Sequence, residues 1–230
     1  TCATAGDVHA STVRTTDDGH SLFDIISAAG TFHVELPMLG DFNVVNALCA
    51  FASAVQVGIA PEVAAQGLNT FPGVPGRCER VTPSGQALAI VDYAHTPDAV
   101  EKILQQLRVA TAGKLICVIG CGGDRDPSKR YDMGKIAASL ADQVIVTDDN
   151  PRSEDPQAIR TEVMRGAHDG TAVVHEVADR HAAIERAITT GRSGDVIAVL
   201  GKGHESGQEI NGEVLPFDDR EVIRQVSSHA

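Results

Sequence analysis

The sequence predicts an α/β protein in which a smaller segment precedes a doubly wound parallel sheet. Three observations support this prediction. From residue 87 onward, short runs that are apolar throughout alternate with segments of helical periodicity, a pattern typical of parallel strands covered by helices on both faces. Before residue 70, strand-like segments precede two helical ones. Residues 71–76 contain two Pro-Gly breaks, which favour a boundary between the two parts.

The N-terminal part is predicted to contain three strands and two helices. Residues 8–15, 22–26 and 31–36 are strand-like and separated by turns, as in a β-meander. Apolar residues then recur at helical spacing up to Gly58, and Asp41 is expected to cap this helix. Pro61 begins a second, short helix that ends near Gly67.

The C-terminal part is predicted to alternate strands and helices. Its strands are residues 88–91, 115–119, 144–146, 172–174 and 196–200, and its helices are residues 97–110, 128–141, 156–168 and 180–190. Asn211-Gly212 then predicts a two-residue hairpin turn. Asp218 is expected to cap a last helix.

Composition excludes several classes of protein. The chain has 230 residues, a net charge of −12 and 43% hydrophobic residues, which fits a packed domain. The negative charge argues against nucleic-acid binding, because phosphate backbones would be repelled. No apolar run reaches the roughly 20 residues of a membrane span, so no membrane insertion is expected. Five widely spaced cysteines without a Cys-x-x-Cys pair predict neither a disulfide framework nor a zinc ribbon. We expect a cytoplasmic protein.

Unusual polar residues follow four of the predicted strands directly. The four loops are residues 92–98, 120–126, 148–152 and 201–205. A doubly wound sheet binds its ligands at the carboxyl ends of its strands. We therefore expect the four loops to form one ligand site.

The charges in these loops suit a zwitterion such as an amino acid. Arg125 and Arg152 offer guanidinium groups to a carboxylate or phosphate. Asp149 and Glu205 offer carboxylates to an ammonium group. A purely structural explanation also exists for each loop: glycines 120–123 can serve a tight turn, residues 149–152 can be an ordinary Asn-Pro turn, and Lys202 can form a buried pair with Glu205.

Standard nucleotide-binding motifs are absent from the sequence. Arg125 stands where a dinucleotide fingerprint requires its third glycine or alanine, and no Gly-x-x-x-x-Gly-Lys-Ser/Thr occurs. His95 lies in a loop with two carboxylates, so burial in the core, contact with a nucleotide and contact with a metal-bound water all remain open for it. Cys121 has no basic partner at readable spacing and is interpreted as a packing residue.

Four motifs follow one another along the chain. They are Gly40-Asp41-Phe42-Asn43-Val44-Val45-Asn46, Gly76-Arg77-Cys78-Glu79, the loop 92–98 and Asp149-Asn150-Pro151-Arg152. In this combination the sequence resembles the Mur ligases, the ATP-dependent amino-acid ligases of peptidoglycan precursor synthesis, from about residue 35 to about residue 225. Asp-Asn-Pro-Arg is the form in the members that add meso-diaminopimelate, whereas lysine-adding members lack the arginine.

The resemblance implies a fold, two domains and a set of binding residues. A Rossmann-like doubly wound domain, residues 81–230, would follow the tail end of a central α/β ATPase domain, residues 1–80. The residues implied to hold meso-diaminopimelate are Arg125, Asp149, Asn150, Pro151, Arg152, Gly201 and Glu205. Those implied to contact the nucleotide are Asn43, Asn46 and Arg77 at its adenine and phosphate side, and Asp92, Tyr93 and His95 closing over it.

The resemblance also implies the reaction. ATP would phosphorylate the acceptor carboxylate of UDP-N-acetylmuramoyl-L-alanyl-D-glutamate, and the amine of meso-diaminopimelate would attack the acyl phosphate, with Mg²⁺ bridging the phosphates. The family's P-loop, metal-binding carboxylate and carbamylated lysine are not in these residues. We therefore expect a piece of a longer enzyme that holds no catalytic or metal-binding residue and does not hydrolyse ATP by itself.

Three other hypotheses stay open. The chain can belong to a ligase for lysine or another diamino acid, or it can be a stand-alone amino-acid-binding module. It can also be a dinucleotide-binding oxidoreductase, against which Arg125 counts. The sequence predicts no particular oligomeric state.

Overall fold

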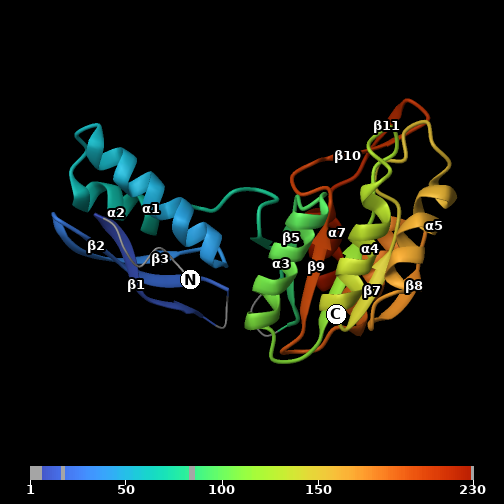
Figure 1. The fold of residues 1–230 in the computed structure, drawn as a ribbon, viewed down its shortest axis with the longest axis horizontal. Coiled ribbons are helices and arrows are strands. Elements are labelled where there is room, and N and C mark those ends of the chain that lie inside the picture. The colour runs from blue at the N-terminus through green and yellow to red at the C-terminus, as the bar shows by residue number, and fades with distance from the viewer. Residues whose placement is uncertain (1–6, 17–18, 83–85, 229–230) are drawn as a thin grey trace. The chain divides into compact units, whose positions relative to one another are not determined.

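The computed structural model describes residues 7–16, 19–82 and 86–228. Contacts between Cα atoms divide the chain into two units, residues 1–74 (unit 1) and residues 75–230 (unit 2). Figure 1 shows the elements of both units in order along the chain. No helix in the described part of the chain is both long enough and apolar enough to cross a bilayer.

Unit 1 is a three-stranded antiparallel sheet with two helices. Its elements are β1 (Val8–Thr15), β2 (Ser21–Ser27), β3 (Gly30–Leu36), α1 (Asp41–Gln56) and α2 (Pro61–Asn69). The strands lie in the order β1-β2-β3, so the predicted meander is confirmed. The core is formed where alternate strand residues such as Phe23 and Ile25 meet Val44, Leu48 and Phe51 of α1.

The predicted cap of α1 is wrong by one residue. Gly40 occupies the cap position with φ 107, and Asp41 is the first helical residue. A positive φ of this size is tolerated by glycine because it has no Cβ. The chain therefore enters the helix at Gly40. The preference of Asp41 for the cap position does not by itself reveal this.

Unit 2 is built on a six-stranded, mostly parallel sheet, which confirms the predicted doubly wound fold. Its strands are β4 (Glu79–Arg80), β5 (Leu88–Asp92), β6 (Leu115–Ile119), β7 (Gln143–Val146), β8 (Val173–Glu176) and β9 (Val196–Leu200). They lie in the order β4-β5-β9-β6-β7-β8. Only β4, at the edge, is antiparallel to its neighbour, and this two-residue strand has no signal in the apolar pattern.

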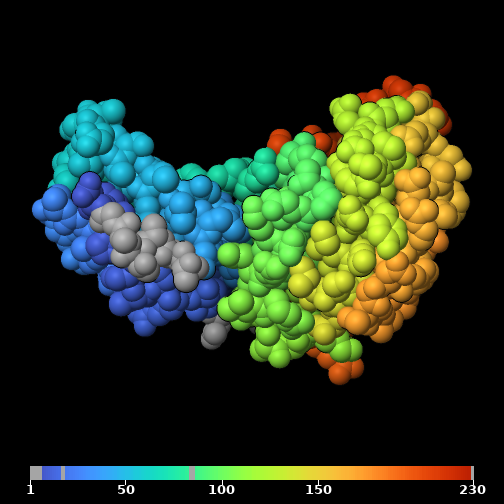
Figure 2. All heavy atoms as spheres, viewed as in Figure 1, coloured from blue at the N-terminus to red at the C-terminus, as the bar shows by residue number. Residues whose placement is uncertain are grey.

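Helices cover both faces of this sheet. They are α3 (Pro97–Ala110), α4 (Lys129–Leu140), α5 (Pro156–Ala167), α6 (Arg180–Thr190) and α7 (Asp219–Ser227). Figure 2 shows α3, α4 and α5, coloured from green to orange, as one continuous layer. Residues of α6 and α7 such as Ile184 and Ile223 pack on Val91, Val118 and Val199 from the sheet. Because helices bury the interior strands on both faces, both faces of these strands carry apolar side chains.

The register of the sheet aligns the four strand ends that precede the polar loops. Asp92 of β5 pairs with Leu200 of β9, Leu200 pairs with Ile119 of β6, and Ile119 pairs with Val146 of β7. These strands are consecutive neighbours because β9 lies between β5 and β6. The four loops consequently leave the same edge of the sheet at the same height.

A β-hairpin follows the loop after β9 in the chain. Its strands are β10 (Gly207–Ile210) and β11 (Glu213–Pro216). Asn211 and Gly212, with φ 51 and φ 80, form the predicted turn, in which both central residues have positive φ. Asp218 accepts a hydrogen bond from the Arg220 N–H and caps α7, as predicted.

Candidate functional site

The loop after β9 lies directly against the loop after β7. Gly201 has φ 114, and a Cβ built there would lie 2.6 Å from Oδ2 of Asp149. Gly201 also donates its N–H to the Asp92 carbonyl oxygen over 3.1 Å. Glycine is therefore required both by the backbone conformation and by the close approach of the carboxylate.

Side chains from these two loops form one hydrogen-bonded group. Asn150 donates from Nδ2 to Oε2 of Glu205 over 2.9 Å. The Lys202 ammonium donates to Oδ1 of Asn150 over 2.8 Å and to Oε2 of Glu205 over 3.4 Å. Its Nζ is 3.6 Å from Oδ1 of Asp149. The predicted pair of Lys202 with Glu205 is thus present, within a larger cluster.

Arg152 is fixed between the glycine loop and the hairpin. Its Nη1 donates to the Gly123 carbonyl oxygen over 2.7 Å, and its Nε donates to Oε2 of Glu209 over 3.1 Å. Its backbone N–H donates to the Glu209 carbonyl oxygen, and its own carbonyl accepts from the Asn211 N–H. These bonds hold Arg152 at φ 53, a conformation that is uncommon for a residue with a Cβ.

The glycine loop packs on the loop after β7. A Cβ on Gly123 would lie 2.0 Å from the Pro151 carbonyl oxygen, so no larger residue fits there. The Asp124 carboxylate accepts from the hydroxyl and the N–H of Ser153, and these hydrogen bonds hold the pKa of Asp124 below its ordinary value. Arg125, by contrast, is exposed, and its Nη1 donates to the neighbouring Asp124 carbonyl oxygen.

A second cluster in unit 2 gathers around the Tyr93 ring. The Arg77 guanidinium lies 4.7 Å from the ring centre, His95 packs edge-on at 4.6 Å, and His204 packs at 5.5 Å. Arg77, His95 and His204 are exposed, so His95 is not a core histidine. One guanidinium and two imidazoles beside an aromatic ring can contact an anionic, planar ligand.

The Asp92 carboxylate binds the backbone next to two members of this second cluster, Arg77 and Tyr93. Burial raises the pKa of Asp92, and the carboxylate accepts hydrogen bonds from the N–H groups of Cys78 and Ala94 over 2.7 and 2.8 Å, which act in the opposite direction. These two hydrogen bonds fix the backbone directly after Arg77 and directly after Tyr93. Asp92 is therefore a residue that organises the loops.

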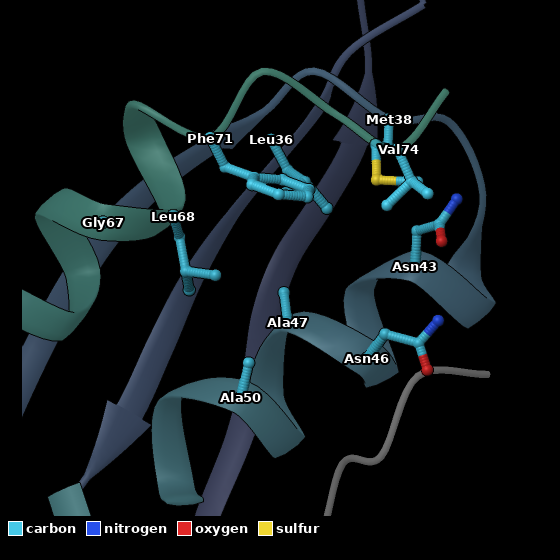
Figure 3. A pocket seen from close by; sticks show the side chains of 10 residues that line it. All are labelled: Leu36, Met38, Asn43, Asn46, Ala47, Ala50, Gly67, Leu68, Phe71 and Val74. Atoms are coloured by element: carbon cyan, nitrogen blue, oxygen red, sulfur yellow. The ribbon is translucent and has the colours of Figure 1, made fainter. Parts of the chain in front are cut away.

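Asn43 and Asn46 lie in unit 1, beside a pocket of about 270 Å³. Figure 3 shows the two amide side chains one turn apart on α1, at the opposite side of the view from Gly67 and Leu68. The Asn43 amide is buried and donates to the Leu39 carbonyl oxygen, whereas Asn46 is exposed. The pocket is lined mainly by apolar side chains and offers its polar groups at one side.

The described residues contain no group of three or more His, Cys, Asp or Glu side chains arranged to hold a metal ion. The carboxylates of Asp149 and Glu205 are instead occupied by Lys202. Among the described residues of unit 2, none is assigned to Mg²⁺.

Cys121, at the end of β6, is expected to be unreactive in the folded protein. Burial raises the pKa of the Cys117 and Cys121 thiols to about 12, and the thiolate is the reactive form. Cys49 is exposed. Iodoacetamide at mildly alkaline pH should modify Cys49 first, and Cys117 and Cys121 only after unfolding. Peptide mass spectrometry over a time course measures this order, and rapid modification of Cys121 would contradict it.

Three residues of the site are absent from the predicted binding residues, although the sequence allows a buried pair of Lys202 with Glu205. Lys202 stands between two glycines and is the centre of the cluster, His204 contacts Tyr93, and Glu209 contacts Arg152. The glycines around Lys202 mark a sharp turn that can bury its side chain. Nothing local places the hairpin residue Glu209 beside a loop 57 positions earlier.

A doubly wound domain with guanidinium, ammonium and carboxylate groups at the carboxyl ends of its strands has the arrangement typical of α/β domains that bind small molecules. A family profile described as "Mur ligase, glutamate ligase domain" matches residues 76–203, more than half of the chain. The chain belongs to the Mur ligase family.

Individual relatives agree with this assignment. The chain is similar to the UDP-N-acetylmuramoyl-L-alanyl-D-glutamate--2,6-diaminopimelate ligase of Streptomyces avermitilis, with 50% identity over 195 residues, 82% of this chain and 38% of the relative. The protein of the same name from Thermosynechococcus vestitus is 49% identical over 85% of this chain and 39% of the relative. A solved structure with that name has a TM-score of 0.73 and 37% identity, and the match covers 98% of this chain and 46% of that one. The chain thus spans about two fifths of the length of these curated relatives.

Proposed function

We propose that this chain is part of an ATP-dependent, cytoplasmic ligase of peptidoglycan precursor synthesis that adds meso-diaminopimelate to UDP-N-acetylmuramoyl-L-alanyl-D-glutamate. The observation that carries the proposal is the group of Asp149, Asn150 and Glu205 around Lys202 at one edge of the sheet, with Arg152 in the same loop as Asp149 and Asn150. Its charges match an amino acid with separate ammonium and carboxylate groups. The identity of the proposed substrates comes from the names of the relatives.

Each binding residue has a proposed role. Arg152, held by Gly123 and Glu209, and the exposed Arg125 face carboxylates of the amino acid. Glu205 faces an ammonium group. The remaining members of the proposed site shape the loops around the ligand; they are Asp149, Asn150, Pro151 and Gly201.

Each unit, taken by itself, contains residues that we propose contact a nucleotide. Tyr93, Arg77 and His95 offer a ring and cationic groups, and Asp92 holds the backbone beside them. In unit 1, Asn43 and Asn46 stand at the adenine side. ATP supplies the phosphoryl group that activates the acceptor carboxylate. Residues 1–80 are then the end of the ATP-binding domain, and residues 81–230 are the amino-acid-binding domain.

Calorimetric titration of the folded chain with meso-diaminopimelate, and separately with L-lysine, tests this proposal. We expect saturable binding of meso-diaminopimelate and weaker binding of L-lysine, which lacks the second carboxylate. Equal affinity for both would favour a lysine ligase. No saturable heat with either, from a sample shown to be folded, would contradict the binding function of this chain.

Arg152→Ala is expected to weaken binding of meso-diaminopimelate by at least about tenfold, because hydrogen bonds to charged groups contribute about 1.5–3 kcal/mol each. The matched control is Arg192→Ala, since this exposed arginine precedes β9 and lies at the opposite edge of the sheet. The control variant should bind as the unchanged chain does. Equal affinity of Arg152→Ala and the unchanged chain would remove Arg152 from the site.

A further inference from the structure

The Lys202 side chain is fully buried, with 0% of its surface exposed. A buried ammonium group without partners is strongly unfavourable, so its position has to be explained by the groups around it. Those groups are Asp149, Asn150 and Glu205, three of the residues proposed above to bind the amino acid.

The backbone of the loop forces the side chain inward. Gly201 and Gly203, on either side of Lys202, have φ 114 and φ 54, and a Cβ on Gly203 would lie 2.7 Å from the Gly76 carbonyl oxygen and 2.7 Å from Cβ of Tyr93. The loop therefore has no room to move away from the sheet edge. The Glu205 N–H donates to the Lys202 carbonyl oxygen over 3.0 Å, which folds Glu205 back over the lysine.

Lys202 connects two side chains that also bind each other. Its ammonium donates to Oδ1 of Asn150, while Nδ2 of Asn150 donates to Oε2 of Glu205. The amide of Asn150 is thereby oriented from both ends. Because Glu205 is one third exposed, it is the member of the group that a ligand can reach, whereas Lys202 is not.

The charges of the group leave a single negative charge. Asp149 and Glu205 contribute two negative charges and Lys202 one positive charge. Arg180, whose charge also acts on Asp149 and Glu205, is paired with the buried carboxylate of Asp219. One unbalanced negative charge is the complement of one ammonium group.

We propose that Lys202 is a positioning residue that orients Asn150 and Glu205 so that the Glu205 carboxylate can accept a hydrogen bond from one ammonium group of the ligand. This inference rests on the proposed function, because that function assigns Glu205 to an ammonium group. Lys202 does not touch the ligand itself.

The test is a comparison of two ligands on the full 230-residue chain. These are meso-diaminopimelate and 2-aminopimelate, in which hydrogen replaces one of the two ammonium groups. The unchanged chain is expected to bind meso-diaminopimelate at least about tenfold more tightly, the effect of one charged hydrogen bond. In Lys202→Met this ratio should fall to about threefold or less. General loosening of the fold would weaken both ligands equally and leave the ratio unchanged.

The control is the same substitution at an exposed site, Lys102→Met. Lys102 pairs with Asp98 on the surface of α3, where ion pairs contribute little, so the ratio should stay at its original value. Lys202→Gln removes the charge but keeps a polar end in the cavity, and replaces Lys202→Met in the titrations if the methionine variant does not fold. An unchanged ratio in the folded variant would overturn the inference.

A second measurement separates this inference from the proposed function. If the unchanged chain does not distinguish the two ligands, the assignment of Glu205 to an ammonium group fails. The crystal structure of the folded Lys202 variant then decides the role of Lys202. Loss of the 2.9 Å contact between Asn150 and Glu205 would support the positioning role, and retention of that contact would refute it.

Discussion

Arg180→Met is expected to lower the free energy of unfolding of unit 2 by about 3–5 kcal/mol, because it leaves a buried carboxylate without its partner. Arg180 and Asp219 both have 0% of their side chains exposed. Nε and Nη2 of Arg180 donate to the two carboxylate oxygens of Asp219, each over 2.7 Å, and Nη2 also reaches the Leu200 carbonyl oxygen. Burial by itself lowers the pKa of Arg180, but Asp219 reverses this and raises it.

Urea unfolding followed by tyrosine fluorescence measures this loss, since both tyrosines of the chain, Tyr93 and Tyr131, belong to unit 2. Lys102→Met, which breaks the exposed pair with Asp98, should change the free energy of unfolding by less than about 1 kcal/mol. The double variant Arg180→Met/Asp219→Leu should recover much of the loss because neither partner then leaves an unpaired buried charge. Equal stability of Arg180→Met and the unchanged chain would show that the pair does not stabilise the fold.

The ion pair of Arg180 with Asp219 also lies next to the loop that carries Lys202. Arg180 begins α6, Asp219 begins α7, and the Leu200 carbonyl that Arg180 contacts immediately precedes the loop of Lys202. The interaction therefore fixes the starts of two helices relative to the end of β9. We expect Arg180→Met to weaken ligand binding through the position of this loop.

Gly166→Ala is expected to destabilise unit 2 by about 1–3 kcal/mol, the range for overpacking, although alanine is the better helix former. A Cβ on Gly166 of α5 would lie 1.9 Å from the Tyr131 carbonyl oxygen of α4, and a Cβ on Gly134 of α4 would lie 2.0 Å from the Val163 carbonyl oxygen of α5. These atoms are backbone, so the two helices have to separate. Local propensity alone predicts a gain of about 0.5–1 kcal/mol.

The control for this substitution is Gly67→Ala in α2. Apart from its chain neighbours and the backbone of its own helix, nothing lies within 4 Å of a Cβ at Gly67, so the gain in helix propensity should appear undiminished. Tyrosine fluorescence reports on Gly166→Ala, and far-UV circular dichroism reports on Gly67→Ala. Stabilisation in both variants would mean that α4 and α5 move apart without loss.

Much of the fold was predictable because its signals are local. The parallel strands are apolar throughout, and their predicted positions differ from β5, β6, β7 and β9 by at most one residue at either end. The turn at Asn211-Gly212 and the cap at Asp218 are set by the conformations those residues favour. The edge strand β4 was missed because two residues carry no periodicity.

The position of the site was predictable for a different reason. Each polar loop follows a strand, and parallel strands end at one edge, so Asp92, Arg125, Asp149 and Glu205 had to lie near that edge. Which side chains touch was not predictable. Lys202 and Asn150 are 52 positions apart and meet because β9 lies between β5 and β6, so that only β6 separates it from β7.

The sequence by itself determined the α/β alternation, the loops that carry charge and the resemblance to the Mur ligases. All three depend only on short stretches of neighbouring residues. Only the tertiary structure decided that β9 lies between β5 and β6, that Arg152 is held by Glu209 and that Lys202 is buried among Asp149, Asn150 and Glu205. Burial and ion pairing depend on chain segments far apart in sequence. Their partners are chosen by packing of the whole domain.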